Sequence, residues 1–170
     1  MLLAGTGHYF ALATSLGWQD VKDTYQRSTL GPLWITLGLG VQVATIGLVF
    51  GLIFGVDLPT YMPFLGISLT LWYFLTGAVN DSTTAYVTSQ HIVKQMYVPS
   101  FFPVLRVVSK NFFIFMHNWL IIIGVMLAFQ ISPKLALLMF FPGLLVVLGT
   151  VYSVSAIAGV VSARYRDVPP

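Results

Sequence analysis

The chain has 170 residues, of which 57% are apolar and only 8% are charged. Soluble domains carry about 25% charged residues, so this chain has too few charges to cover a surface that faces water. Its net charge of +3 is too small and too scattered for a nucleic-acid-binding surface. The absence of cysteine excludes disulfides and thiolate metal sites. We therefore expect a membrane protein that binds lipid and no nucleic acid.

The N-terminal residues predict a helix at the membrane surface. MLLAGTGHYF lacks the basic segment and the long apolar core of a signal peptide, so we expect no cleaved leader. Apolar and polar residues then alternate at helical spacing up to Arg27. We expect an interfacial amphipathic helix within residues 1–29, bent at the Gly17–Trp18 step. An ordinary polar lead-in to a membrane span is the alternative.

Four uncharged runs follow, at residues 28–56, 58–80, 111–133 and 135–163. A helix needs about 20 mostly apolar residues to cross roughly 30 Å of hydrocarbon. We expect transmembrane helices near residues 33–55, 61–79, 112–129 and 137–161. The predicted fold class is therefore an all-α membrane protein, with one interfacial helix and a four-span transmembrane domain in residues 30–170.

The positions of lysine and arginine predict the orientation in the membrane. The two short turns, near residues 55–63 and 130–134, hold only Lys134, and all other lysines and arginines lie in the longer polar pieces. Cytoplasmic loops are enriched in these residues, so we expect the N-terminus, the central loop and the C-terminus to be cytoplasmic. The third transmembrane helix should start near Pro103, so that Arg106 and Lys110 can reach the cytoplasmic surface.

Residues typical of catalysis are few and scattered. His8, His91 and His117 share no metal-ligand spacing, and the chain has no Walker, GxSxG or HExxH motif. Asp81 has no second carboxylate near it in the sequence, which leaves paired acid–base chemistry unsupported and favours a role at a helix end. We predict no catalytic and no metal site, and any ATP that drives the protein should bind to another chain.

Two groups of residues inside the expected spans allow two interpretations each. His117 and Asn118 form a polar pair, which in a membrane can mark a functional site. We favour the simpler interpretation, in which both bond to neighbouring helices. Trp72, Tyr73 and Phe74 lie in the middle of a span, where they could form a wall along which sugars slide or ordinary packing and lipid-facing bulk.

Three motifs resemble permease subunits of polysaccharide-export ABC transporters, in the family's order and spacing and over nearly the whole chain. The first, QDVKDTYQRSTLGPLW, matches at Asp20, Val21, Lys22, Tyr25, Thr29, Leu30, Gly31, Pro32, Leu33 and Trp34. The second, HIVKQMYVPSFFPVL, matches at Ile92, Lys94, Tyr97 and Pro99. The third is the tail ARYRDVP, with Arg164, Tyr165, Arg166, Asp167 and Val168.

The chain departs from the family's pattern in two ways. A basic residue usually precedes the tyrosine of the first motif, where this chain has Thr24 after Asp23. Family members also have six spans, two of them after the third motif. We therefore expect this chain to be the N-terminal part of a six-span permease.

The resemblance implies a role for the central loop, residues 86–103. It resembles the coupling helix that such permeases press into a groove of a cytoplasmic ATPase, with a short helix around residues 88–97 that Pro99 ends. The coupling residues would be His91, Ile92, Lys94, Gln95, Tyr97 and Pro99. A solvated connector is the alternative.

The resemblance also implies a cargo and its partners. The cargo would be a lipid-linked polysaccharide, such as an O-antigen or a teichoic-acid-like polymer, leaving through the bacterial inner membrane. Its head group would meet Lys22, Tyr25, Arg27, Leu30, Gly31 and Trp34, and its sugars would pass Trp72, Tyr73 and Phe74. Two copies of the chain would form a channel above two ATPase subunits, which bind ATP and Mg; Arg164, Tyr165, Arg166 and Asp167 would form a cytoplasmic motif.

Two other functions remain open. A permease of a small-molecule or drug ABC exporter would have a similar topology, although the Leu-Gly-Pro-Leu-Trp motif and the short external turns argue against it. A membrane-embedded enzyme or assembly factor would need no ATPase. It would make His117, Asn118 and Asp81 indispensable, while the central loop would tolerate change.

Overall fold

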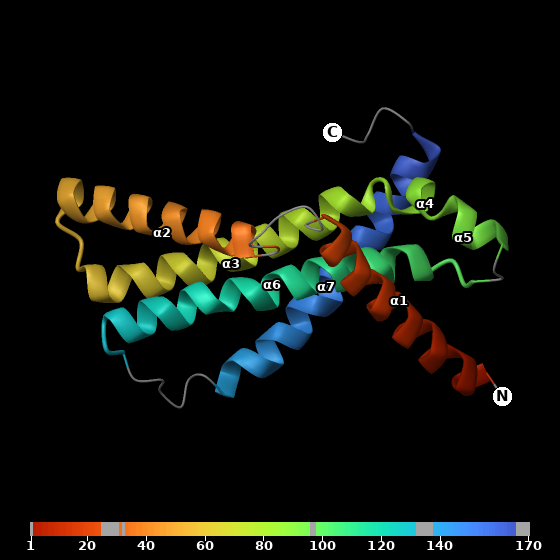
Figure 1. The fold of residues 1–170 in the computed structure, drawn as a ribbon, viewed down its shortest axis with the longest axis horizontal. Helices are drawn as coiled ribbons and strands as arrows, with labels where there is room; N and C mark the ends of the chain where they lie inside the picture. The colour runs from red at the N-terminus through yellow and green to blue at the C-terminus, as the bar shows by residue number, and fades with distance from the viewer. Residues whose placement is uncertain (1, 25–30, 32, 96–97, 132–137, 166–170) are drawn as a thin grey trace.

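The structure, a computed structural model, describes residues 2–24, 31, 33–95, 98–131 and 138–165, and these residues are mainly helical (Figure 1). The helices are α1 (Leu2–Thr24), α2 (Leu33–Phe54), α3 (Leu58–Ser82), α4 (Ala85–Thr88), α5 (Gln90–Gln95), α6 (Phe102–Ala128) and α7 (Phe140–Arg164). The all-helical fold class is confirmed.

Four of these helices, α2, α3, α6 and α7, are long and apolar enough to cross a membrane, which confirms the four predicted spans. Helix α6 begins at Phe102, ahead of the predicted span at residues 112–129, and continues through Arg106 and Lys110. The expectation of a helix start near Pro103 is confirmed. Proline suits this place because the first turn of a helix needs no backbone donor from it.

The bundle has two distinct ends (Figure 1). The α4–α5 segment, the start of α1 and the end of α7 lie at one end, and the turn between α2 and α3 lies at the other, with the last turns of α6. That turn is tight: Gly55 has a φ of 61°, and the Thr60 hydroxyl donates to the Asp57 carboxylate at 2.7 Å. The arrangement matches the sorting of lysine and arginine, while the side that faces the cytoplasm remains a prediction.

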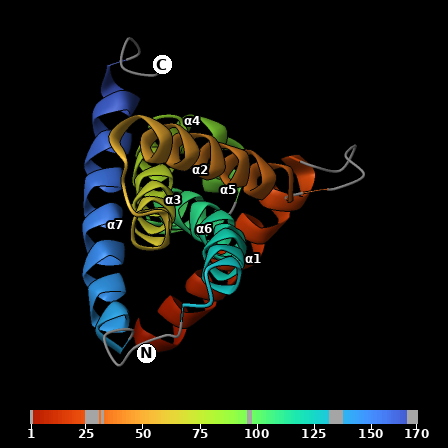
Figure 2. The same cartoon turned by 90° about the vertical axis from the view of Figure 1, so that its left-hand side faces the viewer.

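Helix α6 is the centre of the bundle and contacts α1, α2, α3 and α7. Figure 2 shows α2, α3 and α6 bundled together, with α7 along one side and α1 crossing α6 obliquely. The larger apolar cluster joins α3, α6 and α7 through Phe74, Phe115 and Val151, which are almost fully buried. A smaller cluster around Val43 and Met62 joins α2 to α3. Since lipid is as apolar as these side chains, close packing provides the stabilisation.

Helix α1 is continuous from Leu2 to Thr24, so the predicted bend at the Gly17–Trp18 step was wrong. Gly17 instead marks the place where α1 crosses α6. A Cβ atom there would lie 2.8 Å from the Arg106 carbonyl oxygen and 2.9 Å from the Lys110 nitrogen, both of them backbone atoms. The missing side chain therefore permits a backbone-to-backbone approach, as small residues do between membrane helices.

Candidate functional site

A charged cleft of about 330 Å³ lies where α1, α3, α4 and α6 meet. We use this name for the cleft lined by Asp20, Asp23, Thr24, Asp81, Thr84, Thr88, Ser89, Arg106, Val107 and Lys110. Three carboxylates and two cations from distant parts of the chain thus face one space. Sequence reasoning left Asp81 without a carboxylate neighbour and missed this grouping, because Asp20 and Asp23 come close to it only through the packing of α1 on α6.

The first ion pair of the cleft joins α1 to α6. The Arg106 guanidinium donates from Nε and Nη2 to the two oxygens of Asp20, at 2.8 and 2.6 Å. The two side chains are only 20% and 26% exposed. A two-bond guanidinium–carboxylate pair fixes orientation as well as distance. Beside it, Gly17 removes the side chain that would push the two backbones apart.

The second ion pair joins α3 to α6. Lys110 Nζ donates to the Asp81 carboxylate at 2.9 Å, and Asn111 Nδ2 donates to the same oxygen at 3.0 Å. Gly77, one turn before Asp81, leaves room for the Asn111 amide, since a Cβ there would lie 2.6 Å from Asn111 Oδ1. Asp81 thus has the helix-end packing role that its sequence favoured.

These two pairs add partners that the sequence did not reveal for Arg106 and Lys110, whose place at the cytoplasmic surface stays a prediction. Each cation is neutralised by a carboxylate of a neighbouring helix. The pairing explains why α6 can continue through both residues. A single Lys or Arg in the middle of a span costs about 2.5–3.5 kcal/mol, and a hydrogen-bonded partner removes much of that cost.

The central loop forms two short helices rather than the one predicted around residues 88–97. Helix α4 ends at Thr88, the buried Ser89 follows, and α5 runs to Gln95. Of the predicted coupling residues, His91 is exposed and Ile92 is half-buried. Lys94 and Gln95 lie in α5, and Tyr97 lies outside the described residues.

The base of this loop is closed by two hydrogen bonds. The Tyr86 hydroxyl of α4 donates to the Ser100 carbonyl at 3.1 Å, and the Phe102 amide donates to the Pro99 carbonyl at 3.0 Å. Burial raises the pKa of the Tyr86 phenol above its ordinary value, so it stays a hydrogen-bond donor at neutral pH. Pro99 therefore belongs to the turn that leads into α6.

The predicted head-group residues are only partly described. The Lys22 ammonium lies over the Trp18 ring, 5.3 Å from its centroid. Gly31 has a φ of 56° and accepts a hydrogen bond from the amide of Trp34, whose side chain is exposed. Tyr25, Arg27 and Leu30 lie outside the described residues.

The third motif follows the last span. Arg164 ends α7, and its guanidinium lies over the ring of the exposed Tyr165 at 6.0 Å. Arg166 and Asp167 lie outside the described residues. Among the described residues, no group of three His, Asp or Glu side chains is placed to hold a metal ion.

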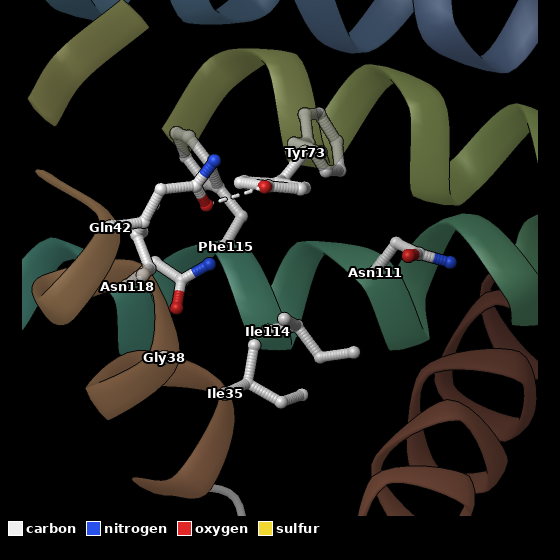
Figure 3. Close-up of a pocket in the computed structure, with 10 residues that line it drawn as sticks. Ile35, Gly38, Gln42, Tyr73, Asn111, Ile114, Phe115 and Asn118 are labelled. Atoms are coloured by element: carbon white, nitrogen blue, oxygen red, sulfur yellow. Dashed lines mark hydrogen bonds between the residues drawn. The ribbon is translucent and has the colours of Figure 1, made fainter. Parts of the chain in front are cut away.

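A second site, the polar pocket, lies among the spans α2, α3 and α6 and has a volume of about 420 Å³ (Figure 3). We use this name for the space lined by Ile35, Gly38, Leu39, Gln42, Tyr73, Phe74, Asn111, Ile114, Phe115 and Asn118. The Tyr73 hydroxyl donates to Gln42 Oε1 at 2.6 Å, and Figure 3 shows Asn118 beside this pair. The amides and the phenol give the pocket donors and acceptors that hydroxyl-rich molecules can use.

The three predicted channel aromatics do not share one environment. Trp72 is 61% exposed on the outside of the bundle, Tyr73 is 42% exposed at the pocket, and Phe74 is 2% exposed in the core. Phe74 packs against Phe112 and Phe115. Sequence reasoning missed Gln42, although a single glutamine inside an uncharged run was a visible signal, since polar residues in spans are rarely placed without a partner.

The favoured interpretation, in which His117 and Asn118 both bond to neighbouring helices, is confirmed for Asn118 and was wrong for His117, which bonds to its own helix and contacts α1 only by ring stacking. The Thr36 hydroxyl of α2 donates to the buried Asn118 Oδ1 at 3.4 Å. His117 Nδ1 donates to the Phe113 carbonyl at 2.8 Å, and the His117 ring stacks on Trp18 of α1. Asn118 therefore joins α6 to α2, and His117 joins it to α1.

Comparison with known proteins finds distant homology to two proteins of Klebsiella pneumoniae, both named O-antigen export system permease protein RfbA. Each is 24% identical to this chain over 166 residues, which cover 95% of the chain and 63% of the relative. The chain thus spans less than two thirds of the length of these relatives. No protein-family profile and no solved structure match it. The chain is a multi-pass membrane protein and a distant relative of O-antigen export permeases.

Proposed function

We propose that this chain is the membrane-spanning part of an ATP-driven exporter that moves a lipid-linked polysaccharide across the bacterial inner membrane. The observation that carries this proposal is homology to O-antigen export permeases over 95% of the chain. The ATP and its Mg ion would be bound and hydrolysed by a separate cytoplasmic ATPase subunit, so this chain would be a permease and not an enzyme.

The end of the bundle that carries α4 and α5 would face the cytoplasm and this ATPase. In the sequence, seven of the eight lysines and arginines lie outside the two short turns, as the positive-inside rule predicts for the cytoplasmic side. The α4–α5 segment is compact and tied to the start of α6 by the Tyr86–Ser100 bond. A displacement applied to this segment would therefore be transmitted to α6 and not be lost in deformation of the loop. Two copies of the chain would act with two ATPase subunits.

The cargo would meet two parts of the chain. Its phosphorylated head group would approach Lys22, Arg27 and the Leu30–Trp34 stretch at the cytoplasmic surface. Its sugars would pass the face that holds Tyr73. The polar pocket supports this path, because Gln42, Tyr73 and Asn118 provide amide and phenol groups together with aromatic surface. Such groups bind sugars weakly enough to release them again.

The two other functions receive less support from the structure. The groups that an embedded enzyme would need are engaged in packing contacts: Asp81 with Lys110, and Asn118 with Thr36. A small-molecule exporter would use the same ATPase coupling, and only the cargo would differ. Surface polysaccharide and drug resistance, measured in the same deletion strain, separate these two exporters.

The test of the proposal targets the α4–α5 segment. Single cysteines are introduced at His91, Lys94 and Gln95; residues 1–170 contain no cysteine, and any cysteine elsewhere in the full-length protein is first replaced. We expect thiol crosslinks to the ATPase whose yield changes between ATP-bound and nucleotide-free membranes. A cysteine at Thr60, in the turn at the opposite end, is the matched control and should form none. Absence of crosslinks at all three positions, with the ATPase present and active, contradicts the proposal.

A further inference from the structure

Four charged side chains join three helices at the base of the α4–α5 segment: Asp20 of α1, Asp81 of α3, and Arg106 and Lys110 of α6. We infer that α1, α3 and α6 move as one ion-paired body, which delivers the displacement of α4–α5 to the surface helix α1. These four residues would act on transport indirectly, by holding α1 and α3 in place on α6. The inference rests on the proposed function, because the ATPase would supply the displacement of α4–α5. The contact between α1 and α6, which we call the joint, can be tested without the ATPase.

The spacing on α6 is the first argument. Arg106 and Lys110 are four residues apart, so they lie one helical turn from each other. Arg106 nevertheless pairs with a carboxylate of α1, and Lys110 pairs with one of α3. One turn of α6 thus holds both neighbours, and a displacement of either neighbour must act on that turn.

The second argument is the short path from α4 to this turn. Asp81 lies four residues before the start of α4, and the intervening residues are hydrogen-bonded. The hydroxyls of Thr83 and Thr84 donate to the carbonyls of Asn80 and Asp81 at 2.7 and 3.2 Å. Thr84, Thr88 and Ser89 also line the charged cleft. A push on α4 therefore reaches Asp81 through a stiff connection.

The third argument is that the pairs are too costly to open. All four side chains are partly buried, with exposed fractions between 20% and 38%. Removing one partner leaves the other charge unpaired beside apolar helices, which is strongly unfavourable. The close contact at Gly17 adds a backbone surface to the α1–α6 joint. By contrast, α2 has no charged residue, and α7 has only Arg164 at its end.

The experiment locks α1 to α6 covalently. The ring centroids of Trp18 and Phe113 lie 5.2 Å apart, so Trp18→Cys with Phe113→Cys places one thiol on each helix at the joint, in a full-length protein from which any cysteine beyond residue 170 has been removed. A short bifunctional thiol reagent with an internal disulfide closes the lock, and a reductant opens it. The readout is surface polysaccharide in the native host, with the full-length protein and its ATPase, compared between locked and reduced cells of one strain.

We expect the locked protein to export as well as the reduced one. Asp20→Asn should lower export by about tenfold, within the range of typical coupling between sites. The lock should restore export to Asp20→Asn, because it replaces the missing pair. The double reversal Asp20→Arg with Arg106→Asp should restore it as well. If Asp20→Asn does not reach the membrane, the test uses two other proteins. One is the double variant Asp20→Arg with Arg106→Asp, and the other is the locked protein that keeps Asp20.

Three results overturn the inference: a lock that abolishes export until it is reduced, normal export by Asp20→Asn, or a lock that forms in Asp20→Asn without restoring export. A failure of the proposed function gives a different pattern, in which deletion of the gene leaves surface polysaccharide unchanged. The crosslinking yield between positions 18 and 113, compared with and without Asp20→Asn, still reports whether the pair holds α1. Equal crosslinking yields with and without Asp20→Asn would contradict the joint, even if the proposed function fails.

Discussion

The charged cleft and the polar pocket are both built on α6, but they are held together in different ways. The cleft is held by two ion pairs, Arg106 with Asp20 and Lys110 with Asp81. The pocket is held by neutral hydrogen bonds such as Tyr73–Gln42, which a hydroxyl group of a ligand can replace. Asn111 belongs to both, since it lines the pocket and donates to Asp81. From this contrast we expect the cleft to transmit displacement between helices and the pocket to bind and release hydroxyl groups.

The largest effect should follow from reversing one charge of the cleft. Arg106→Glu places a second carboxylate beside Asp20 in a partly buried site, and breaking such a pair costs about 3–5 kcal/mol. We expect a clear loss of thermal stability of the purified protein in detergent, measured by its melting temperature. The matched control is the double variant Asp20→Arg with Arg106→Asp. A single variant as stable as the unmodified protein would show that the cleft is not held by charge.

Substitution of Gly17 should have the next largest effect. Gly17→Ala puts a Cβ against two backbone atoms of α6, which cannot rotate away, so α1 must shift. We expect a destabilisation of about 1–3 kcal/mol, as for other overpacked contacts, and a lower crosslinking yield between positions 18 and 113. Gly7→Ala is the control in the same helix, because nothing lies within 4 Å of its Cβ position. Equal melting temperatures of the two variants would contradict the crossing.

Substitutions in the polar pocket should lower export more than they lower stability. Tyr73→Phe removes one neutral hydrogen bond, worth about 0.5–1.5 kcal/mol, and should leave the melting temperature nearly unchanged while surface polysaccharide falls. Ala at Trp72 and Tyr73 should impair export further without disturbing ATPase assembly, measured by co-purification. Export at the unmodified level in this double variant would remove both residues from the cargo path.

The smallest effect should come from Tyr86→Phe at the base of the α4–α5 segment. Loss of its bond to Ser100 should cost about 1 kcal/mol. Burial raises the Tyr86 pKa above its ordinary 10.0, so the folded protein favours the protonated phenol. The stabilisation is therefore complete below pH 10.0 and is lost as the pH rises through the raised pKa. Melting curves of the two proteins should differ by a constant amount at neutral pH and converge in strong alkali.

The sequence was sufficient for the features that depend on local pattern. Runs of uncharged residues gave the four spans, and Pro103 gave the start of α6. The pairing of Asp20 with Arg106 depends on two residues 86 positions apart, and no local pattern contains it. Gly17 was misinterpreted because a glycine inside a helix fits either a bend or a close contact, and only the neighbouring helix decides which. The sequence also did not reveal the break between α4 and α5 at Ser89, which is buried in the structure.

The length of α6 has a consequence for the surrounding bilayer. Its 27 residues span about 40 Å, whereas the hydrocarbon layer is roughly 30 Å thick. We expect the excess to fall at the end that carries Arg106 and Lys110, where the first turns of α6 would hold the α4–α5 segment above the lipid surface. A thicker bilayer would draw the Asp81–Lys110 pair into hydrocarbon, at a modest cost for each ångström of mismatch. Lipid acyl-chain length thereby becomes a variable that sets how far this segment stands out from the membrane.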